Sequence, residues 1–298
     1  MSKSRKGFTL IEVALFLVIT GALFASVVIG VQNSIYQQRF NDSVQSYVEF
    51  LRRVYSGVTN VENIGSGRST YAIYGKLVTF NSANDSGDAL ENPEKGTNVI
   101  HVYNVVGRIS DIGTGNVLDT LKALNADVVI SDGDLPHTAG IIESFIPKWA
   151  SRIETPCNGN VCDNLPFKGA LLIVRHPSSG TVHTFVMKNQ DIDVDSKIED
   201  VEDAYQIAVS ERDSATTQEE KDAAENRITE ITNRKLDNIL APYLNSSSFK
   251  IEAVDFCIDP EGDLVNNNRR DVRIVADAQN GSGIEILNDE NNNCRPRE

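Results

Sequence analysis

Apolar residues fill one long stretch near the start of the chain and then continue at helical spacing. The run from Phe8 to Val31 holds 24 residues, and Glu12 is its one ionisable side chain. At 1.5 Å per residue the run makes a helix of about 36 Å, which is enough to cross a bilayer. Beyond the run, apolar residues recur every three or four positions up to Val58. Residues 32–60 are therefore predicted to continue the helix with one apolar face.

Strand signals dominate much of the remaining chain. Segments 170–176 and 181–188 flank the turn sequence Pro-Ser-Ser-Gly, which predicts a β-hairpin. Residues 117–124 are expected to form a short helix. We expect residues 141–153 to form a second short helix or an irregular segment that buries Trp149. The other expected strands, rich in β-branched and aromatic residues, are 69–80, 98–106, 127–131, 249–258, 271–278 and 283–287.

One segment breaks the strand pattern. Residues 197–240 are rich in Glu, Asp, Ala, Gln and Lys and contain neither Pro nor Gly. Thr217 and Glu220 have the spacing of a capping box, which marks the start of a second helix. The pattern predicts a helical hairpin inserted between strands, either as a solvated extension or as a partner-binding projection. The second helix is expected to make its contacts through Ala223, Ile228, Ile231 and Leu236.

The residues around the start of the apolar run add a processing signal. A short basic leader, residues 1–7, ends in Gly7. A carboxylate such as Glu12 inside a membrane-length helix costs roughly 2.5–3.5 kcal/mol, so a neighbouring cation is expected to neutralise it. Cutting the chain after Gly7 would create such a cation, the α-amino group of Phe8. We therefore expect the leader to be removed and the chain to assemble through this helix.

This N-terminal segment resembles the processing signal of type IV prepilins and of the pseudopilins of type II secretion and competence systems. The basic leader, Gly7, the aromatic Phe8, Glu12 and the apolar tail carry the resemblance. It implies cleavage between Gly7 and Phe8 by a prepilin peptidase, followed by N-methylation of Phe8. It also implies insertion into a helical filament, in which Glu12 pairs with the methylated amine.

The resemblance and the patterns together predict a pilin-like α+β fold. A long N-terminal helix, half membrane-spanning and half amphipathic, would pack on an antiparallel β-sheet head that carries the helical-hairpin insertion. The expected parts are a leader (1–7), a transmembrane and assembly helix (8–31), its amphipathic continuation (32–60) and a head (61–298) with the insertion at 197–240. Before assembly the chain would cross the inner membrane once, with its head outside the cytoplasm, and other pilin or pseudopilin subunits would be its partners.

Other interpretations of the N-terminal segment account for less. A secretory signal peptide has an apolar core of 7–15 residues and a small-x-small cleavage site, and the run here is longer. An ordinary single-pass anchor fits the length and the basic flank but explains neither Glu12 nor the Gly7-Phe8 pair. A structural subunit of a pilus-like filament is the favoured function. The alternatives are a type II secretion pseudopilin, a competence or adhesion minor pilin, and a simple bitopic membrane protein.

Net charge narrows the choice of partners. The formal net charge is −14, and removing the basic leader makes the chain more acidic. Electrostatic binding of nucleic acid needs a basic stripe, so the head as a whole is not expected to bind nucleic acid. The length, the acidity and the insertion favour a minor subunit, because a bulky head packs poorly in a dense filament.

The four cysteines indicate disulfides. They lie in the part of the chain expected to face an oxidising compartment, and four cysteines allow three connectivities. We favour Cys157–Cys162, which closes a tight loop with an Asn-Gly turn, and Cys257–Cys294, which ties the C-terminal tail to a strand. A zinc site at the Cys-x4-Cys spacing is the alternative.

The remaining polar residues show no catalytic pattern. Of the four histidines, His176 and His183 approach each other across the predicted hairpin, without a carboxylate or thiol at metal-ligand spacing. Hydrolase, nucleotide-binding and zinc-protease motifs are absent from the sequence. Segments 191–195 and 288–293 offer oxygen ligands for Ca²⁺ but lack the order of an EF-hand loop. We expect no enzyme activity, no cofactor and no metal.

Overall fold

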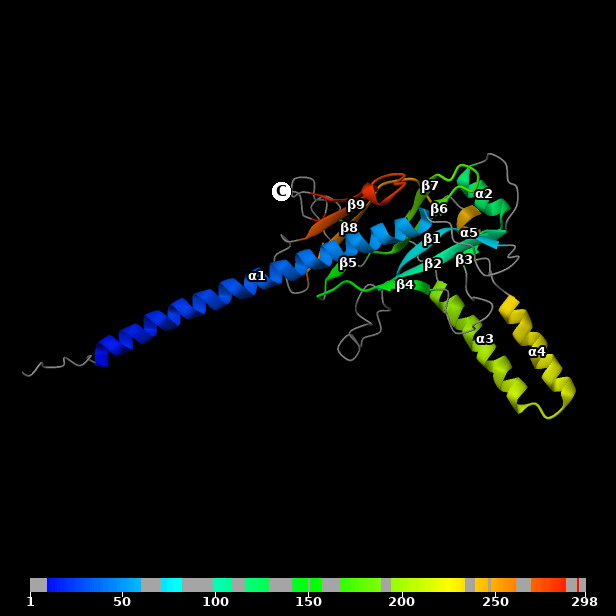
Figure 1. Cartoon of the computed structure of the whole chain (residues 1–298), viewed down its shortest axis with the longest axis horizontal. Coiled ribbons are helices and arrows are strands. Elements are labelled where there is room, and N and C mark those ends of the chain that lie inside the picture. Colours follow the sequence, from blue (N-terminus) through cyan, green and yellow to red (C-terminus); the bar gives the residue numbers. More distant parts are fainter. Residues whose placement is uncertain are drawn as a thin grey trace, which may run out of the picture.

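A computed structural model describes residues 10–59, 71–81, 99–108, 116–128, 141–149, 151–156, 167–188, 194–233, 239–245, 248–260, 269–287 and 294. Its elements in chain order are α1 (Leu10–Thr59), β1 (Tyr71–Asn81), β2 (Val99–Arg108), α2 (Val117–Ala123), β3 (Asp127–Val128), β4 (Ile141–Phe145), β5 (Arg152–Glu154), β6 (Gly169–Arg175), β7 (Val182–Lys188), α3 (Val194–Ser214), α4 (Gln218–Asn233), α5 (Ala241–Asn245), β8 (Val254–Asp259), β9 (Arg270–Ile274), η1 (Gly281–Gly283) and β10 (Ile284–Ile286). The chain has the expected α+β class, with a long N-terminal helix and antiparallel strands (Figure 1).

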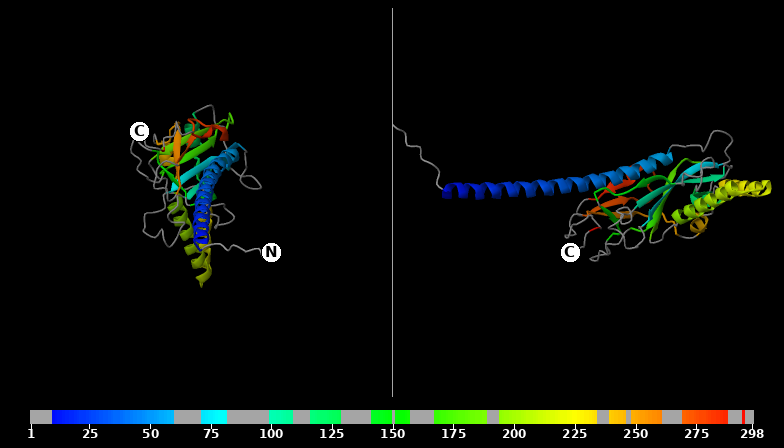
Figure 2. Two further views of the ribbon diagram at one scale, coloured as in Figure 1. Left: turned by 90° about the vertical axis from the view of Figure 1, so that its left-hand side faces the viewer. Right: turned by 90° about the horizontal axis from the view of Figure 1, so that it is seen from below.

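α1 is one continuous helix of 50 residues, about 75 Å long. Figures 1 and 2 show its first half projecting away from the head and its second half lying against the strands. This confirms the prediction that the apolar run continues into an amphipathic helix. Residues 1–9, which include the expected start at Phe8, lie outside the described residues. The buried positions of the second half keep the predicted spacing and are Phe40, Val44, Tyr47, Val48, Phe50, Leu51, Val54, Tyr55 and Val58.

The described part of the head contains two antiparallel sheets, where the sequence led us to expect one. The larger sheet has the order β3-β2-β1-β6-β7, and β4 also pairs with β2. β6 and β7 form the predicted hairpin, and Gly180 in its turn has a φ of 71°, which a residue with a side chain rarely adopts. The smaller sheet has the order β10-β9-β8-β5. Main-chain hydrogen bonds between Val186 and Lys250, at 2.8 and 3.0 Å, link β7 to the segment that leads into β8.

Both faces of the larger sheet are buried. In β6, Leu171 and Ile173 face the core shared with α1 and the smaller sheet. Leu172 and Val174 face a second core, which α2 and α5 cover. Successive residues of a strand point to opposite faces, so a strand buried on both sides is apolar throughout. This explains why the sequence of β6, GALLIVR, shows no alternation.

α3 and α4 form the predicted helical hairpin, which projects from the head at the end far from the first half of α1 (Figures 1 and 2). The capping box is confirmed, since Thr217 N–H donates to Glu220 Oε2 at 3.0 Å and Glu220 N–H donates to Thr217 Oγ1 at 3.3 Å. The expected contact through Ala223 is wrong: Ala224 is the buried alanine, and Ala223 is exposed. One residue turns a helix by about 100°, so the approach of α3 decides which alanine is covered. α4 is described from Gln218 to Asn233, and residues 234–238, which include Leu236, lie outside the described residues.

The expectation for residues 141–153 is also wrong. The segment contains two strands, since β4 pairs with β2 and β5 pairs with β8. Trp149 lies between them and is 54% exposed, so it is not a core residue. Short apolar segments fit a helix or a strand equally well, and a pairing partner distant in the sequence decides between them. For β4 that partner is β2, with Ile100 opposite Phe145.

Candidate functional site: the exposed half of α1

The first half of α1, Leu10–Arg39, is called the exposed half here, and Phe40–Thr59 is called the packed half. Large apolar side chains of the exposed half are open to solvent, from 39% for Val28 to 88% for Leu10. α1 is long and apolar enough to cross a membrane, and its most apolar 18-residue window, with a mean hydropathy of 2.5, has no buried residue. So large an apolar surface marks a site that lipid or another protein covers.

Polar groups within the apolar run are few, and two of them bond within the helix. Thr20 Oγ1 donates to the carbonyl of Phe16 at 2.8 Å, and Ser26 Oγ donates to the carbonyl of Leu23 at 2.7 Å. Such bonds satisfy the hydroxyl groups without water, so both side chains are compatible with a hydrocarbon surrounding. Glu12 lies in the first turn of the helix. It is the one ionisable group of the run, and the first turn forms the end of α1 farthest from the head (Figure 1).

An aromatic cluster holds the packed half of α1 between the sheets. Phe50 stacks on Phe145 of β4, with ring centroids 4.7 Å apart. Tyr47 contacts Phe256 of β8 edge-on at 5.8 Å. Phe256 also stacks on Phe80 of β1 at 5.0 Å. Because aromatic pairs add roughly 0.5–1.5 kcal/mol each to area burial, this cluster ties α1 firmly to both sheets.

Nearer the C-terminal end of α1, a buried chain of hydrogen bonds holds the helix against the head. Tyr55 Oη and Thr184 Oγ1 of β7 are 2.8 Å apart, and Thr184 Oγ1 donates to the carbonyl of Ala278. Burial raises the pKa of both Tyr47 and Tyr55 above the ordinary value of 10.0. Both phenols are therefore neutral at physiological pH. The helix is held by uncharged groups that do not titrate in the working range.

The C-terminal end of α1 meets basic side chains and a close backbone contact. Arg175 Nη1 of β6 donates to the carbonyl of Thr59 at 3.0 Å, and Lys76 of β1 lies against Gly57. Cations at this end complement the helix dipole. A Cβ added to Gly281 of η1 would lie 3.0 Å from Arg52 Cγ, so a residue with a side chain at this position would require Arg52 to move by a few tenths of an ångström. The head thus holds the exposed half of α1 at a defined angle.

Several predicted site residues lie outside the described residues, namely Gly7, Phe8, Cys157 and Cys162. Cys257 and Cys294 are joined by a disulfide, as expected. The bridge spans 37 residues, and closing a loop of this length stabilises a fold by about 4 kcal/mol in the chain-entropy account. It connects β8, whose Phe256 packs on α1, to the C-terminal tail.

Histidines 176 and 183 do not bond to each other. His176 Nδ1 accepts from the main-chain N–H groups of Ser178 and Ser179 at 3.3 Å in the β6–β7 turn. His183 Nδ1 lies 3.1 Å from Asp277 Oδ1 after β9. Within the described part of the chain, groups of three or more His, Cys, Asp or Glu side chains that could hold a metal ion are absent.

Sequence reasoning missed the contact of Arg39 with Trp149. The guanidinium carbon of Arg39 lies 4.8 Å from the centre of the Trp149 ring. Trp149 was expected to be buried by a short helix or an irregular segment at residues 141–153. The sequence signal that points the other way is Pro147, because proline favours a turn over a helix interior.

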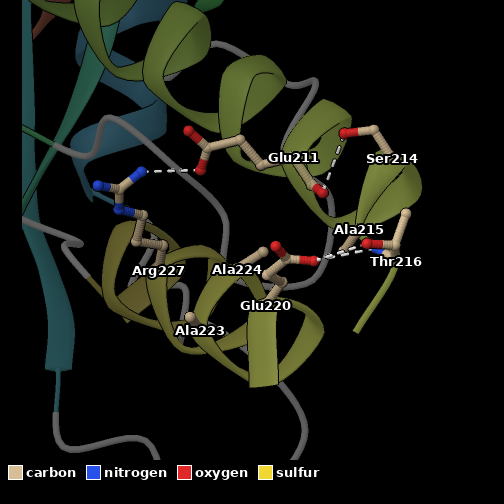
Figure 3. A pocket seen from close by; sticks show the side chains of 8 residues that line it. All are labelled: Glu211, Ser214, Ala215, Thr216, Glu220, Ala223, Ala224 and Arg227. Carbon is tan, nitrogen blue, oxygen red and sulfur yellow. Dashed lines mark hydrogen bonds and ion pairs between the residues drawn. The ribbon is translucent and has the colours of Figure 1, made fainter. Parts of the chain in front are cut away.

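The α3–α4 hairpin contains a hollow of about 470 Å³ near its tip (Figure 3). Its charged side chains face one another across the hollow. Arg227 Nη1 of α4 lies 2.7 Å from Glu211 Oε2 of α3, and Glu220 accepts from the turn. These charged side chains are paired within the hairpin and stabilise its turn, so the hollow gives no indication of a ligand.

Comparisons of the chain with family models, with curated proteins and with solved structures find no match.

Proposed function

We propose that the chain is a structural subunit of a type IV pilus-like filament, with a pilin-like fold. A prepilin peptidase cuts it between Gly7 and Phe8, methylates Phe8, and releases a subunit that assembles through α1. One observation carries the proposal: a continuous helix of 50 residues presents an exposed apolar half with Glu12 in its first turn. The resemblance of residues 1–13 to prepilin signals supports it.

Two stages follow from the proposal. The chain first waits in the membrane with the exposed half of α1 in lipid and the head outside the cytoplasm. It then leaves the lipid when the same apolar surface packs against α1 of neighbouring subunits. Glu12 is neutralised in the filament by the methylated amine of Phe8, its own or that of the next subunit. An ATPase supplied by other proteins drives the step.

The shape of the head favours a low-abundance subunit. The α3–α4 hairpin stands out from the head (Figure 1), and a repeating subunit must pack its head against copies on several sides. A projecting hairpin obstructs that packing. The related alternatives are a subunit of a secretion pseudopilus and a subunit of a competence or adhesion pilus. Neighbouring genes distinguish these systems: a secretin indicates secretion, a DNA channel indicates competence, and a retraction ATPase indicates a pilus.

Processing is the test of the proposal. The full chain is expressed in a bacterial membrane with and without a prepilin peptidase, and its intact mass is measured. We expect loss of residues 1–7 and one added methyl group only when the peptidase is present. Gly7→Leu should keep the full mass, because the peptidase requires a small residue at the cut, whereas the leader variant Ser4→Ala should be processed normally.

A wild-type chain that keeps residues 1–7 in the presence of an active peptidase would contradict the proposal. It would favour the simple bitopic membrane protein, which needs α1 only as an anchor. A known prepilin processed in the same cells serves as the positive control.

A further inference from the structure

β4 and the turn after it run along α1 toward its exposed half. Arg53 of α1 forms an ion pair with Glu143, and Phe50 stacks on Phe145. Arg39, more than three turns nearer the N-terminus, contacts Trp149. As the residue numbers rise along β4 and its turn, the numbers of the α1 residues that they contact fall. The turn at residues 146–149 is therefore nearer to the apolar run than β4 is.

The height of this turn along α1 can be compared with the thickness of a bilayer. Helical side chains lean toward the N-terminus, so the guanidinium of Arg39 lies near the level of Ile35 and Tyr36. That level is about 6 Å beyond Val31, the last residue of the apolar run. The headgroup layer on each side of a bilayer is roughly 5–8 Å thick. The run of about 36 Å fills the roughly 30 Å of hydrocarbon when the helix tilts, and in that orientation Trp149 on Arg39 lies at the height of the headgroups.

Exposed apolar side chains gather at the same place. Among the described residues of the head, five large apolar side chains are exposed, and three of them, Ile142, Ile146 and Trp149, belong to β4 and its turn. Lys148 is exposed beside them. Tryptophan and tyrosine are enriched at both membrane–water interfaces, and lysine and arginine beside them act as interfacial anchors. We call this surface the Trp149 ledge; it consists of Ile35, Tyr36, Arg39, Ile146, Lys148 and Trp149.

The backbone of the turn holds the indole outward. Trp149 has a φ of 59°, a left-handed conformation that bulky residues rarely adopt. Ser151 N–H donates to the carbonyl of Lys148 at 3.1 Å and closes the turn around it. The turn therefore displays a tryptophan that is 54% exposed although Arg39 contacts one face of its ring.

We propose that the Trp149 ledge binds the headgroup layer of the membrane that α1 crosses. Trp149 and Ile146 enter the layer, and Arg39 and Lys148 bind anionic phosphate groups. The head is thereby held against the membrane at a fixed tilt while the subunit waits for assembly. This inference rests on the membrane stage of the proposed function.

Trp149 is the single tryptophan of the chain, so its fluorescence reports on the ledge without labelling. The full chain is placed in lipid nanodiscs, one copy per disc, made mostly of phosphatidylcholine with a minor fraction of phosphatidylglycerol. Nitroxide groups are attached either to the lipid headgroup or deep in the acyl chain. We expect a blue shift relative to detergent solution, and stronger quenching by the headgroup label than by the acyl label.

A matched variant moves the probe to the far end of the molecule. In Trp149→Phe with Ile207→Trp, the tryptophan occupies a position of α3 that is 58% exposed. Neither label should quench it. Equal quenching of the two proteins by the headgroup label would overturn the inference, because it would reflect collisions and not a docked ledge.

Two further results separate the inference from the proposed function. The chain should float with vesicles of the same lipids after an alkaline wash; if it floats and Trp149 is not quenched, the inference fails and membrane insertion stands. If it does not float, both fail. A blue shift that grows with the number of protein copies per disc would assign the ledge to a second copy of the chain and would also overturn the inference.

Discussion

Glu12 combines a charge with an apolar setting, and the proposed function uses that combination. In water, on an exposed first turn, its carboxylate is solvated. In lipid or in a packed filament the charge needs a cation close by. At the scale of single residues, Glu12 therefore distinguishes the two functions. A simple membrane anchor does not need the carboxylate, whereas the proposed filament subunit needs it to pair with the Phe8 amine.

Replacing Glu12 with Ala should therefore leave membrane insertion intact and strongly reduce incorporation into filaments. Membrane flotation and the amount of the chain in sheared filaments measure the two effects. Thr20→Val is the matched control, since Thr20 is a second polar residue of the run whose hydroxyl is satisfied within the helix. Normal incorporation of the Glu12 variant would exclude the pairing with the Phe8 amine.

Asp127 is a buried carboxylate with a structural role. It is 2% exposed, and its two oxygens accept the main-chain N–H groups of Ile239 and Leu240, each at 2.8 Å. These bonds hold the start of α5 against the second core across more than a hundred residues of sequence. The contact was not predicted, because a single Asp at a strand start gives no indication of its partner.

Asp127→Asn should lower the free energy of unfolding by about 1–3 kcal/mol, because the new amide group turns a donor toward a main-chain donor. Urea unfolding followed by circular dichroism measures it. Asp119→Asn changes a side chain that is 68% exposed and should shift stability by less than about 0.5 kcal/mol. Equal urea midpoints for the two variants would show that the hydrogen bonds of Asp127 do not stabilise the fold.

At the scale of elements, the α3–α4 hairpin depends on its turn. The N–H groups of Thr216 and Thr217 donate to Glu220 Oε2, each at 3.0 Å. These hydrogen bonds, chiefly the one from the Thr217 main chain, lower the pKa of Glu220 from its ordinary 4.5. A carboxyl group with a lowered folded-state pKa stabilises the fold fully above its unfolded pKa, and this contribution is lost as the pH falls through the folded pKa.

The first turn of α4 should accordingly lose protection against amide exchange as the pH falls below about 4.5, after correction for the intrinsic exchange rate. Glu220→Gln keeps a capping acceptor without a titrating group, so its protection should not change over the same range. A loss of protection that is identical in the two proteins would assign the effect to another group.

At the scale of the whole molecule, the head and the exposed half of α1 are separable. Among the described residues, members of either core cluster begin at Phe40. The packed half is in contrast part of the head, since it supplies nine of the buried apolar residues. The packed half thus takes part in the folding of the head, and under the proposed function the exposed half alone enters the membrane or the filament.

A chain that starts at Gln32 should be soluble without detergent and keep the melting temperature of the head. A chain that starts at Leu51 should aggregate, because it loses five buried side chains worth about 1.5–3 kcal/mol each, which together equal the stability of a typical domain. Size-exclusion chromatography and thermal melting measure both. A folded chain from Leu51 onward would show that α1 is not part of the core.

Local patterns determined much of this protein from sequence alone. The apolar run and the three-and-four spacing after it predicted α1 as one continuous helix with an apolar first half and an amphipathic second half. The predicted change at residues 31 and 32 is too early, because the buried positions begin only at Phe40. Turn residues predicted the β6–β7 hairpin, and the spacing of Thr217 and Glu220 predicted the start of α4. These features depend on residues a few positions apart, so a short stretch of sequence contains their whole cause.

Contacts between distant residues were decided only by the tertiary structure. Residues 141–145 became a strand because β2 offered an edge, and this carried Trp149 to the surface beside Arg39. The division into two sheets and the capping of residues 239 and 240 by Asp127 have the same origin. A strand edge, a register or a buried donor exists only once another segment is in place. The sequence determined the long apolar helix, and packing decided which surface of the head lies beside it.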